Sequence, residues 1–216
     1  MKRGWPGELI ARTGRVALIV PGVAMARRTL EYAVRNREYH RPAMPTPPFD
    51  YDTLSFWKKR LRTRLESFRV GVEYGFFMLP ADDPCGLVLG DVTFSQVFRG
   101  PLSGAVLGYK LDRVQEGKGL MRESLEAALQ FMFSDVKLHR IEANVRPENE
   151  RSFRLLRRMG FVVEGFSRAY LKLDGGWRDH IRLARINPEH AGGNPASLDL
   201  RILGIGMPSE PVNSSD

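Results

Sequence analysis

The sequence predicts an α/β fold in which helices flank a mixed sheet. Apolar residues alternate along segments such as 105–111, which is typical of strands, and recur every three to four residues along 120–133, which is typical of helices. In chain order these patterns give a strand, two helices, three strands, a helix, a strand, a helix and two strands. This order, in 216 residues of which 43% are hydrophobic and 27% charged, fits one globular domain with a packed core.

The first half of the domain is expected to be mainly helical. A short strand over residues 15–19 leads into a helix over 23–35. The segment 41–49 holds four prolines and is therefore expected to be a loop. A second helix is expected over 51–68, where apolar residues stand at 54, 57, 61, 65 and 68. The other face of this helix carries a run of basic residues: Lys58, Lys59, Arg60, Arg62 and Arg64.

The rest of the domain, from residue 72 onward, is expected to hold most of the sheet. Helices are expected over residues 120–133 and 150–159. The sequence Asp174-Gly175-Gly176 supplies the residues that a tight turn with positive φ needs, so it is expected to join the last two strands. The strands themselves are expected over residues 72–79, 87–94, 105–111, 140–146, 163–173 and 177–185.

Composition limits the domain organisation and the cellular context. Residues 1–14 and 189–216 are expected to be a flexible N-terminal extension and a variable C-terminal tail around one domain over 15–188. Cys85 is the single cysteine, so neither a disulfide framework nor a multi-cysteine metal site is expected, and the cytoplasm is the default location. No window approaches the roughly 18–20 apolar residues that a membrane span requires. The net charge of +8 suits either an acidic ligand or partner, or simply a soluble surface.

A glycine-containing loop precedes the expected helix over 120–133. Its sequence is Gln115-Glu116-Gly117-Lys118-Gly119-Leu120. The first N–H groups of a helix have no partners within the helix, so this loop offers several donors to an anion. A nucleotide P-loop would need Ser or Thr where Gly119 stands, and a dinucleotide fingerprint would need glycine where Arg122 stands. A tight turn without any ligand is the structural alternative.

A second signal opens the expected helix over 150–159. Asn149 is a good N-cap, and Ser152 follows three residues later, near the helix entrance. The helix ends at Met159-Gly160-Phe161, where glycine is the usual left-handed terminator. Such a helix needs no ligand by itself. Its combination with the glycine loop, one strand apart, favours a site for a phosphate-bearing ligand.

The combined motifs resemble the GCN5-related N-acetyltransferases, and within them the RimJ/RimL-type ribosomal-protein alanine N-acetyltransferases. The resemblance is dense over residues 94–188, looser back to 15, and does not cover the tail. The last hairpin matches the RimJ type best. The residues that carry it are Gly108-Tyr109, the loop through Met121, His139-Arg140-Ile141, Asn144, Pro147 to Ser152, Met159-Gly160-Phe161, Glu164-Gly165 and Asp174 to His180.

The resemblance implies the acyl-CoA N-acyltransferase fold of this family. That fold is a mostly antiparallel sheet of about seven strands, splayed at a central parallel pair and flanked by helices. It also implies that acetyl-CoA is the cosubstrate, that no metal is used, and that acetyl-CoA lies between strands 105–111 and 140–146. The residues expected to bind it are Leu111, Gln115, Glu116, Gly117, Lys118, Gly119, Leu120, Met121, Asn149 and Arg157.

Acetyl transfer needs a free amine, a polarised thioester and a proton for the departing thiolate. Ser152 is expected to hydrogen-bond the departing sulfur, with Tyr170 as the alternative. Period-two alternation in 140–146 places Glu142 and Asn144 on one face, and both are candidate catalytic residues. No carboxylate is placed as the obvious base. This favours an α-amine acceptor with a pKa of ~7.7–8 over a lysine with a pKa of ~10.4.

Three functional hypotheses follow. The first is acetylation of the N-terminal α-amine of a protein, with a ribosomal protein or the ribosome as partner. The second keeps the fold but changes the acceptor to a small amine such as a polyamine, an amino acid or an antibiotic. The third is a non-catalytic module that binds RNA or the ribosome through the basic helix; sequence-specific nucleic-acid binding is not expected. The protein is expected to be a monomer or a homodimer.

Overall fold

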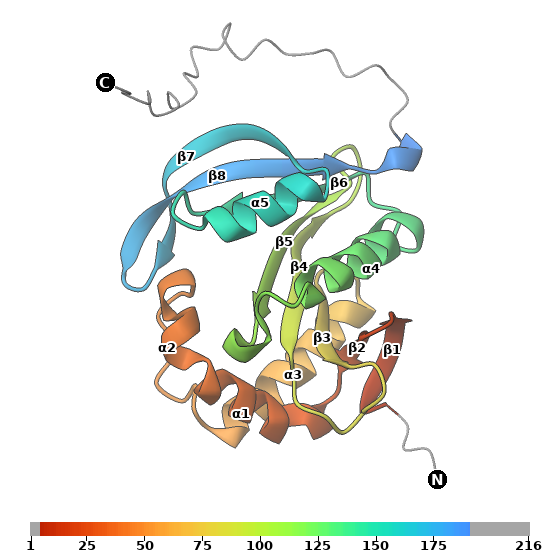
Figure 1. The fold of residues 1–216 in the computed structure, drawn as a ribbon, viewed down its shortest axis with the longest axis vertical. Helices are drawn as coiled ribbons and strands as arrows, with labels where there is room; N and C mark the ends of the chain where they lie inside the picture. Colours follow the sequence, from red (N-terminus) through yellow and green to blue (C-terminus); the bar gives the residue numbers. More distant parts are fainter. Residues whose placement is uncertain (1–4, 191–216) are drawn as a thin grey trace, which may run out of the picture.

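The computed structural model describes residues 5–190, and they form one eight-stranded sheet with helices on both faces (Figure 1). The strand order is β1-β2-β3-β4-β5-β6-β8-β7, and only the β5–β6 pair is parallel. The fold class is therefore confirmed, including the central parallel pair. The strands are β1 (Gly7–Arg12), β2 (Val16–Pro21), β3 (Tyr74–Pro80), β4 (Gly90–Phe98), β5 (Gly104–Leu111), β6 (Arg140–Val145), β7 (Val162–Leu173) and β8 (Gly176–Ile186).

Strand β1 corrects the expected N-terminal extension. Residues 7–12 pair antiparallel with β2 and add an eighth strand, where about seven were expected. The strand lies at the edge of the sheet, and its residues are partly buried or exposed. An edge strand of this kind needs few apolar residues, so the sequence beside Pro6 and Gly7 shows only a weak strand pattern. The expected C-terminal tail lies outside the described residues from 191 onward. A short 3-10 turn, Pro188–His190, ends the described part.

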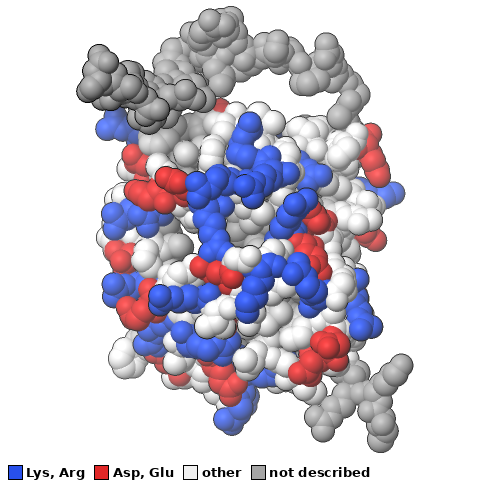
Figure 2. All heavy atoms as spheres, viewed as in Figure 1, with Lys and Arg blue, Asp and Glu red and all other residues white. Residues whose placement is uncertain are grey.

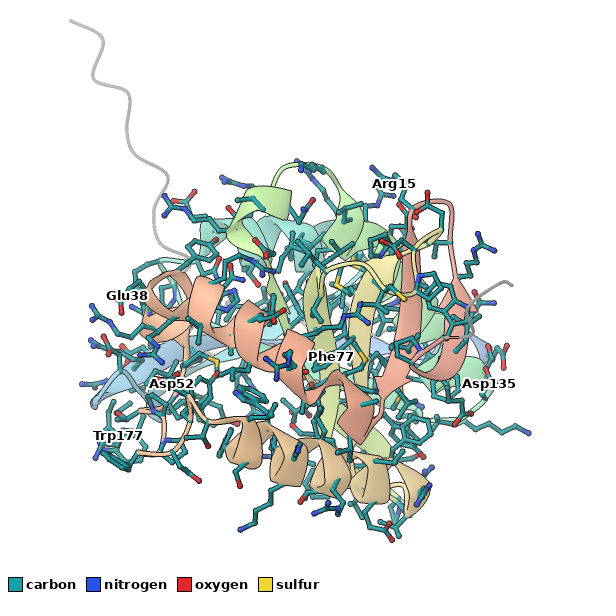
Figure 3. All side chains as sticks on the ribbon, turned by 90° about the horizontal axis from the view of Figure 1, so that it is seen from below. Arg15, Glu38, Asp52, Phe77, Asp135 and Trp177 are labelled. Carbon is teal, nitrogen blue, oxygen red and sulfur yellow. The ribbon has the colours of Figure 1, made fainter. Side chains whose placement is uncertain are left out.

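The two faces of the sheet are covered by different helices. The helices α1 (Ala26–Arg35) and α3 (Leu54–Arg69) pack on one face, where Ile19 and Phe77 belong to their core cluster. Seen from below in Figure 3, these helices lie together on one side of the strands. Helices α4 (Leu120–Ser134) and α5 (Glu150–Arg158) cover the other face with Leu18 and Phe76. All six residues of β2 are buried because β2 faces a core on both sides.

Two short elements lie in the segment between α1 and α3. A short helix, α2 (Arg37–His40), and a 3-10 turn, Arg41–Ala43, precede the proline-rich loop. The loop is tied to the β7–β8 turn because the Asp174 N–H donates to the Met44 carbonyl at 2.9 Å. None of the helices within residues 5–190 is long and apolar enough to cross a membrane.

Arg64 corrects the expected basic face of α3. It is only 7% exposed, and it donates to Thr93 Oγ1 at 2.7 Å and lies 3.5 Å from the Glu73 carboxylate. Position 64 follows the buried Leu61 by three residues, so it falls on the inward side of the helix. Gly75 leaves room for the guanidinium, because a Cβ there would lie 2.2 Å from Arg64 Nη2. The exposed basic residues of this run are Lys58, Lys59, Arg60 and Arg62.

Candidate active site

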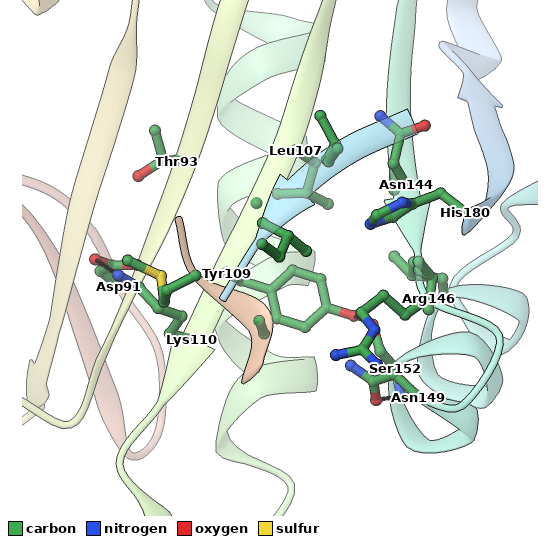
Figure 4. Close-up of a pocket in the computed structure, with 18 of the residues that line it drawn as sticks. Asp91, Thr93, Leu107, Tyr109, Lys110, Asn144, Arg146, Asn149, Ser152 and His180 are labelled. Atoms are coloured by element: carbon green, nitrogen blue, oxygen red, sulfur yellow. Dashed lines mark hydrogen bonds and ion pairs between the residues drawn. The ribbon is translucent and has the colours of Figure 1, made fainter. Parts of the chain in front are cut away.

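The parallel pair β5–β6 splits part of the way along its length. The two strands are paired from Gly104 and Arg140 up to Leu107 and Ala143, but β5 continues to Leu111 and β6 to Val145. In the close-up of Figure 4, Tyr109 reaches from β5 across this gap towards Ser152 at the start of α5. The gap therefore opens between the two strands where the family resemblance implies a ligand.

Two cavities meet at this gap from opposite faces of the sheet. The first, of about 410 Å³, lies on the α3 side, and the second, of about 360 Å³, lies on the side of α4 and α5. Both are lined by Tyr109 and Ser152. The first cavity is also lined by Trp57, Arg60, Asp91, Asn144 and His180. The second cavity is also lined by Leu111, Glu116, Met121, Asn149 and Arg151. Two ligands could thus approach one pair of hydroxyl groups from opposite sides.

The glycine loop has the conformation that an anion-binding loop needs. Gly117 and Gly119 have φ angles of +75° and +76°, a region that favours glycine. A Cβ on Gly117 would meet no atom within 4 Å, so its backbone faces open space. Gly119 is the N-cap of α4 and no side chain caps that terminus. The first N–H groups of α4 are therefore free of side-chain caps at the place predicted for the pyrophosphate.

The turn between β1 and β2 braces this loop. Arg15 donates from Nη1 to the Lys118 carbonyl at 2.7 Å and from Nε to Glu123 Oε2 at 2.8 Å. Glu123 also accepts from the Arg15 N–H at 2.9 Å and from the Thr13 hydroxyl. Burial alone would raise the pKa of Glu123, but these hydrogen bonds outweigh burial and lower it. This brace cannot be predicted from local sequence patterns, because Arg15 and Glu123 are more than a hundred residues apart.

Of the other predicted loop residues, Glu116 and Met121 line the second cavity. Gln115 accepts a hydrogen bond from Lys118 Nζ at 3.0 Å, and Leu120 is the buried first residue of α4. Glu116 forms an ion pair with Arg151 and accepts from the Tyr39 hydroxyl. The Leu111 carbonyl accepts from His40 Nε2 at 2.9 Å. Burial lowers the pKa of His40, which favours this neutral, donating ring.

Ser152 is held at the point where the cavities meet. Asn149 caps α5 by accepting from the Ser152 N–H at 3.1 Å, as its N-cap pattern predicted. The Ser152 hydroxyl lies 2.6 Å from the Tyr109 hydroxyl. Burial raises the pKa of Tyr109 to about 12, although the hydrogen bond to Ser152 partly opposes this rise. Tyr109 was quoted only as part of the family resemblance, because its alternating position in a strand is equally typical of a core residue.

Glu142 lies away from the gap. Its carboxylate is 2.9 Å from Arg140 Nε and 3.2 Å from Arg182 Nη2, and it lines a separate cavity of about 260 Å³. Burial alone would raise the pKa of Glu142, but the two arginines outweigh burial and lower it. Tyr170, the alternative to Ser152, lines this separate cavity too. Asn144, which alternation places on the same strand face as Glu142, does line the first cavity.

Arg157 also lies away from the gap. It sits in the last turn of α5 and donates to the Phe161 carbonyl at 2.9 Å, so it satisfies the end of its own helix. Arg151, six residues earlier in the first turn, is the arginine of α5 that lines the second cavity. On the face seen in Figure 2, basic side chains gather around a central hollow, and the exposed ones on α5 are Arg151, Arg154, Arg157 and Arg158.

Within residues 5–190, no group of three His, Cys, Asp or Glu side chains is arranged to hold a metal ion. The side chains and backbone groups that meet at the gap are hydroxyl, amide, imidazole and N–H groups. A split parallel pair, an uncapped helix N-terminus behind a positive-φ glycine loop and two cavities meeting at a hydroxyl pair define a class of enzyme. They define a transferase that carries a group from a phosphate-bearing cosubstrate to an acceptor on the opposite face.

Comparison with known proteins identifies the family. Residues 24–162 match the acetyltransferase (GNAT) domain. The chain is 36% identical over 167 residues to the probable N-acetyltransferase YjcK of Bacillus subtilis, covering 77% of this chain and 91% of that protein. It is also 36% identical over 168 residues to the ribosomal protein uS5-alanine N-acetyltransferase of Escherichia coli, covering 78% and 86%. The chain belongs to the GNAT family and is an acetyl-CoA-dependent N-acetyltransferase.

Solved structures agree with this assignment. The ribosomal-protein-S5-alanine acetyltransferase of Vibrio fischeri superposes with a TM-score of 0.78 at 31% identity, covering 83% of this chain and 97% of that one. RimJ of Mycobacterium smegmatis, solved with a CoA disulfide, superposes with a TM-score of 0.75 at 28% identity, covering 94% and 98%. The predicted family resemblance and the RimJ/RimL relationship are thus confirmed.

Proposed function

We propose that this enzyme acetylates the N-terminal α-amine of a protein, and that its acceptor is a ribosomal protein. The observation that carries the proposal is the meeting of two cavities, from opposite faces of the sheet, at the Tyr109–Ser152 hydroxyl pair. Relatives that match over most of this chain are named for uS5-alanine acetylation, which supports the ribosomal acceptor. A cytoplasmic location, as for the ribosome, belongs to the same proposal.

The second cavity is proposed to hold acetyl-CoA. The backbone N–H groups from Gly117 to Leu120 would bind its pyrophosphate, since the Cβ position of Gly117 has open space around it and no side chain caps the N-terminus of α4. Leu111, Glu116, Met121 and Asn149 line the cavity between that loop and the gap. Gln115 and Lys118 would support the loop through their mutual hydrogen bond. The cosubstrate supplies the thioester that is broken in the reaction.

The Tyr109–Ser152 pair is proposed to protonate the departing thiolate. The raised pKa of Tyr109, about 12, keeps its hydroxyl protonated throughout the neutral range, so the pair always has a proton to donate. Ser152 lies between Tyr109 and the capped start of α5, which fixes its direction. Asn144, on the acceptor side of the gap, is proposed to orient the amine.

The charges around the first cavity favour a peptide over a polyamine. Its charged lining consists of one carboxylate and four cationic side chains: Asp91, and Arg60, Arg64, Lys110 and Arg146. Asp91 lies 3.6 Å from Lys110 and 3.9 Å from Arg64, so its charge is already balanced. A polycation such as spermidine would be repelled by this lining, whereas a peptide brings a single ammonium group followed by carbonyl groups. We therefore place the small-amine hypothesis second.

A panel of acceptors tests the proposed function. Purified enzyme is given acetyl-CoA with peptides that begin with Ala, Ser or Thr, with the same peptides blocked at the N-terminus but carrying lysine, and with spermidine. Thiol release is expected only with the free N-termini, and mass spectrometry is expected to place the acetyl group on the α-amine. Transfer to spermidine or to the blocked peptides alone would overturn the proposal. Comparing ribosomal proteins from cells with and without the enzyme would then identify the acceptor.

Two arginines of α5 form a matched pair that tests the cosubstrate site. Arg151→Ala is expected to raise the KM for acetyl-CoA about 3- to 10-fold, because it removes a cation that lines the cavity and pairs with Glu116. Arg157→Ala removes the same charge from the far end of the same helix and is expected to leave that KM unchanged. Initial rates at varied acetyl-CoA distinguish the two, and a larger effect at Arg157 would contradict this placement.

The exposed basic residues of α3 stay a predicted docking surface. Lys58, Lys59, Arg60 and Arg62 are exposed, and Arg60 also lines the first cavity, where the acceptor would enter. A negatively charged partner near the acceptor protein would meet this surface. The number of subunits, monomer or homodimer, stays a prediction as well.

A further inference from the structure

We propose that His180 is the general base of this enzyme, taking the proton that the acceptor nitrogen loses through its Nε2 atom. His180 lies on β8 and is 2% exposed, yet it lines the first cavity together with Asn144 and Tyr109. Figure 4 shows its ring beside the Asn144 side chain, at the edge of the gap. The inference rests on the proposed function, because it concerns the amine acceptor that this cavity would receive.

The hydrogen bonds of the ring fix its tautomer. His180 Nδ1 lies 3.0 Å from the Arg178 carbonyl oxygen, which can only accept a hydrogen bond. Nδ1 must therefore carry the proton in the neutral ring, and Nε2 is left with a lone pair. Tyr170 packs edge-on against the ring, with the two centroids 5.8 Å apart, and this holds the ring's direction. The imidazole is thus oriented by its own strand and by β7.

The sheet register places the His180 side chain on the acceptor side. Asn144 of β6 is paired with Arg182 of β8, so the two side chains share one face of the sheet. His180 is two residues from Arg182 and shares that face. Tyr109 alternates with Gly108 and Lys110, so its ring belongs to the other face and its hydroxyl meets Ser152 across the gap. The base and the proton donor therefore approach the reacting atoms from opposite sides.

Asn144 gives a second indication of a ligand at this place. Its Oδ1 atom is buried and has no hydrogen-bond partner among the described residues. A buried amide oxygen without a donor is costly, and an acceptor amine carries N–H donors that could satisfy it. His180 and Asn144 together would hold one nitrogen between an imidazole and an amide.

The surroundings leave no better base on this face. Asp91 is the one carboxylate among the described residues that line the first cavity, and Lys110 and Arg64 both lie within 4 Å of it. The Asp91 carboxylate is therefore already engaged by two cations. The charged and titratable groups that face His180 or share its cavity are Tyr170 of β7, Arg178 and Arg182 of β8, Arg146 of β6, Tyr109 and Lys110 of β5, Asp91 of β4, Tyr51 before α3, and Arg60 and Arg64 of α3.

The proposed step takes one proton from the acceptor nitrogen and gives one proton to the sulfur. The neutral amine nitrogen forms a bond to the thioester carbon, and the carbon–sulfur bond breaks. Nε2 takes the one proton that the nitrogen loses in becoming an amide, and the Tyr109–Ser152 pair gives one proton to the sulfur. The imidazolium proton then returns to this pair through solvent. A neutral acceptor is available because an α-amine has a pKa of ~7.7–8.

The test compares kcat/KM across pH for wild type and His180→Gln, using a peptide that the wild type acetylates. His180→Gln is expected to lower kcat/KM about 100-fold or more at pH 7, with unchanged CoA affinity and an unchanged melting temperature. Its deficit should shrink at higher pH, where solvent hydroxide can take the proton. Asp91→Asn removes the competing carboxylate and is expected to keep the wild-type pH dependence whatever its rate.

A folded His180→Gln variant within threefold of wild type, with the wild-type pH profile, would overturn the inference. So would loss of the acidic limb in Asp91→Asn alone. If His180→Gln does not fold, NMR of wild-type enzyme with 15N-labelled histidine decides: the inference requires that the neutral His180 ring carries its proton on Nδ1, and a neutral ring protonated on Nε2 would overturn it. Absence of wild-type activity on any free N-terminus would instead count against the proposed function, because the inference depends only on ratios to wild type.

Discussion

Gly117→Glu is expected to lower the affinity for CoA by at least ~100-fold. The Gly117 backbone faces open space beside the uncapped start of α4, so a carboxylate there would stand where the pyrophosphate is proposed to bind. Like charges at such short range repel strongly, and the φ of +75° adds a conformational cost for any residue with a Cβ. Isothermal titration with CoA measures the loss.

Gly117→Ala is the matched control for this change. It carries the same conformational cost but no charge, and its Cβ would meet no atom within 4 Å. We expect it to bind CoA within about tenfold of wild type, since ~1–2 kcal/mol is the usual cost of a left-handed residue. Equal losses in the two variants would show that the loop acts through its shape alone, and normal binding by Gly117→Glu would place the pyrophosphate elsewhere.

The glycine loop and the cap of α5 could be predicted from sequence because local residues determine both. Gly117 and Gly119 adopt positive φ angles, and Asn149 caps its helix through a neighbour three residues away. The alternating pattern of 105–111 and the helical spacing of 120–133 gave the elements on either side of the loop. For this loop and this cap the determining contacts lie within a few residues, which is why the sequence predicted them.

Arg64 shows where local patterns fail. It looked like one more residue of a basic helix face, but the pocket left by Gly75 and the partners Glu73 and Thr93 come from other elements. Arg157 was expected beside the cosubstrate; it lies in the last turn of α5 and donates to the Phe161 carbonyl, and the Arg151 and Arg157 variants test that expectation.

Tyr109 and His180 were missed as functional residues for a related reason. His180 is buried and Tyr109 is half-buried, and each stands in a strand, where an aromatic ring normally packs in the core. Their roles depend on the split between β5 and β6, which exposes both to cavities although they lie on different strands and faces. The motifs of the family resemblance include both residues, but only the sheet register shows on which face each side chain lies.

Removing the proton donor from the departing sulfur is expected to have the other large effect. Tyr109→Phe and Ser152→Ala should each lower kcat about 10- to 100-fold, with little change in the KM for acetyl-CoA, because a positioned proton donor acts mainly in the transition state. Each single variant removes one hydroxyl of a pair separated by 2.6 Å. Single-turnover rates with saturating acetyl-CoA measure the chemical step directly.

The double variant decides whether the two hydroxyl groups act as a unit. In one case, Ser152 protonates the sulfur and Tyr109 replaces the Ser152 proton through their hydrogen bond. Removing the second hydroxyl after the first then lowers the rate little further, and the double variant is about as slow as the slower single variant. Independent roles would make the two losses multiply. Because the pKa of Tyr109 is raised to about 12, neither outcome should bring a Tyr109 ionisation into the pH profile below about pH 11. A basic limb near pH 8 to 9 that disappears in Tyr109→Phe would contradict the assignment of Tyr109 as a protonated donor.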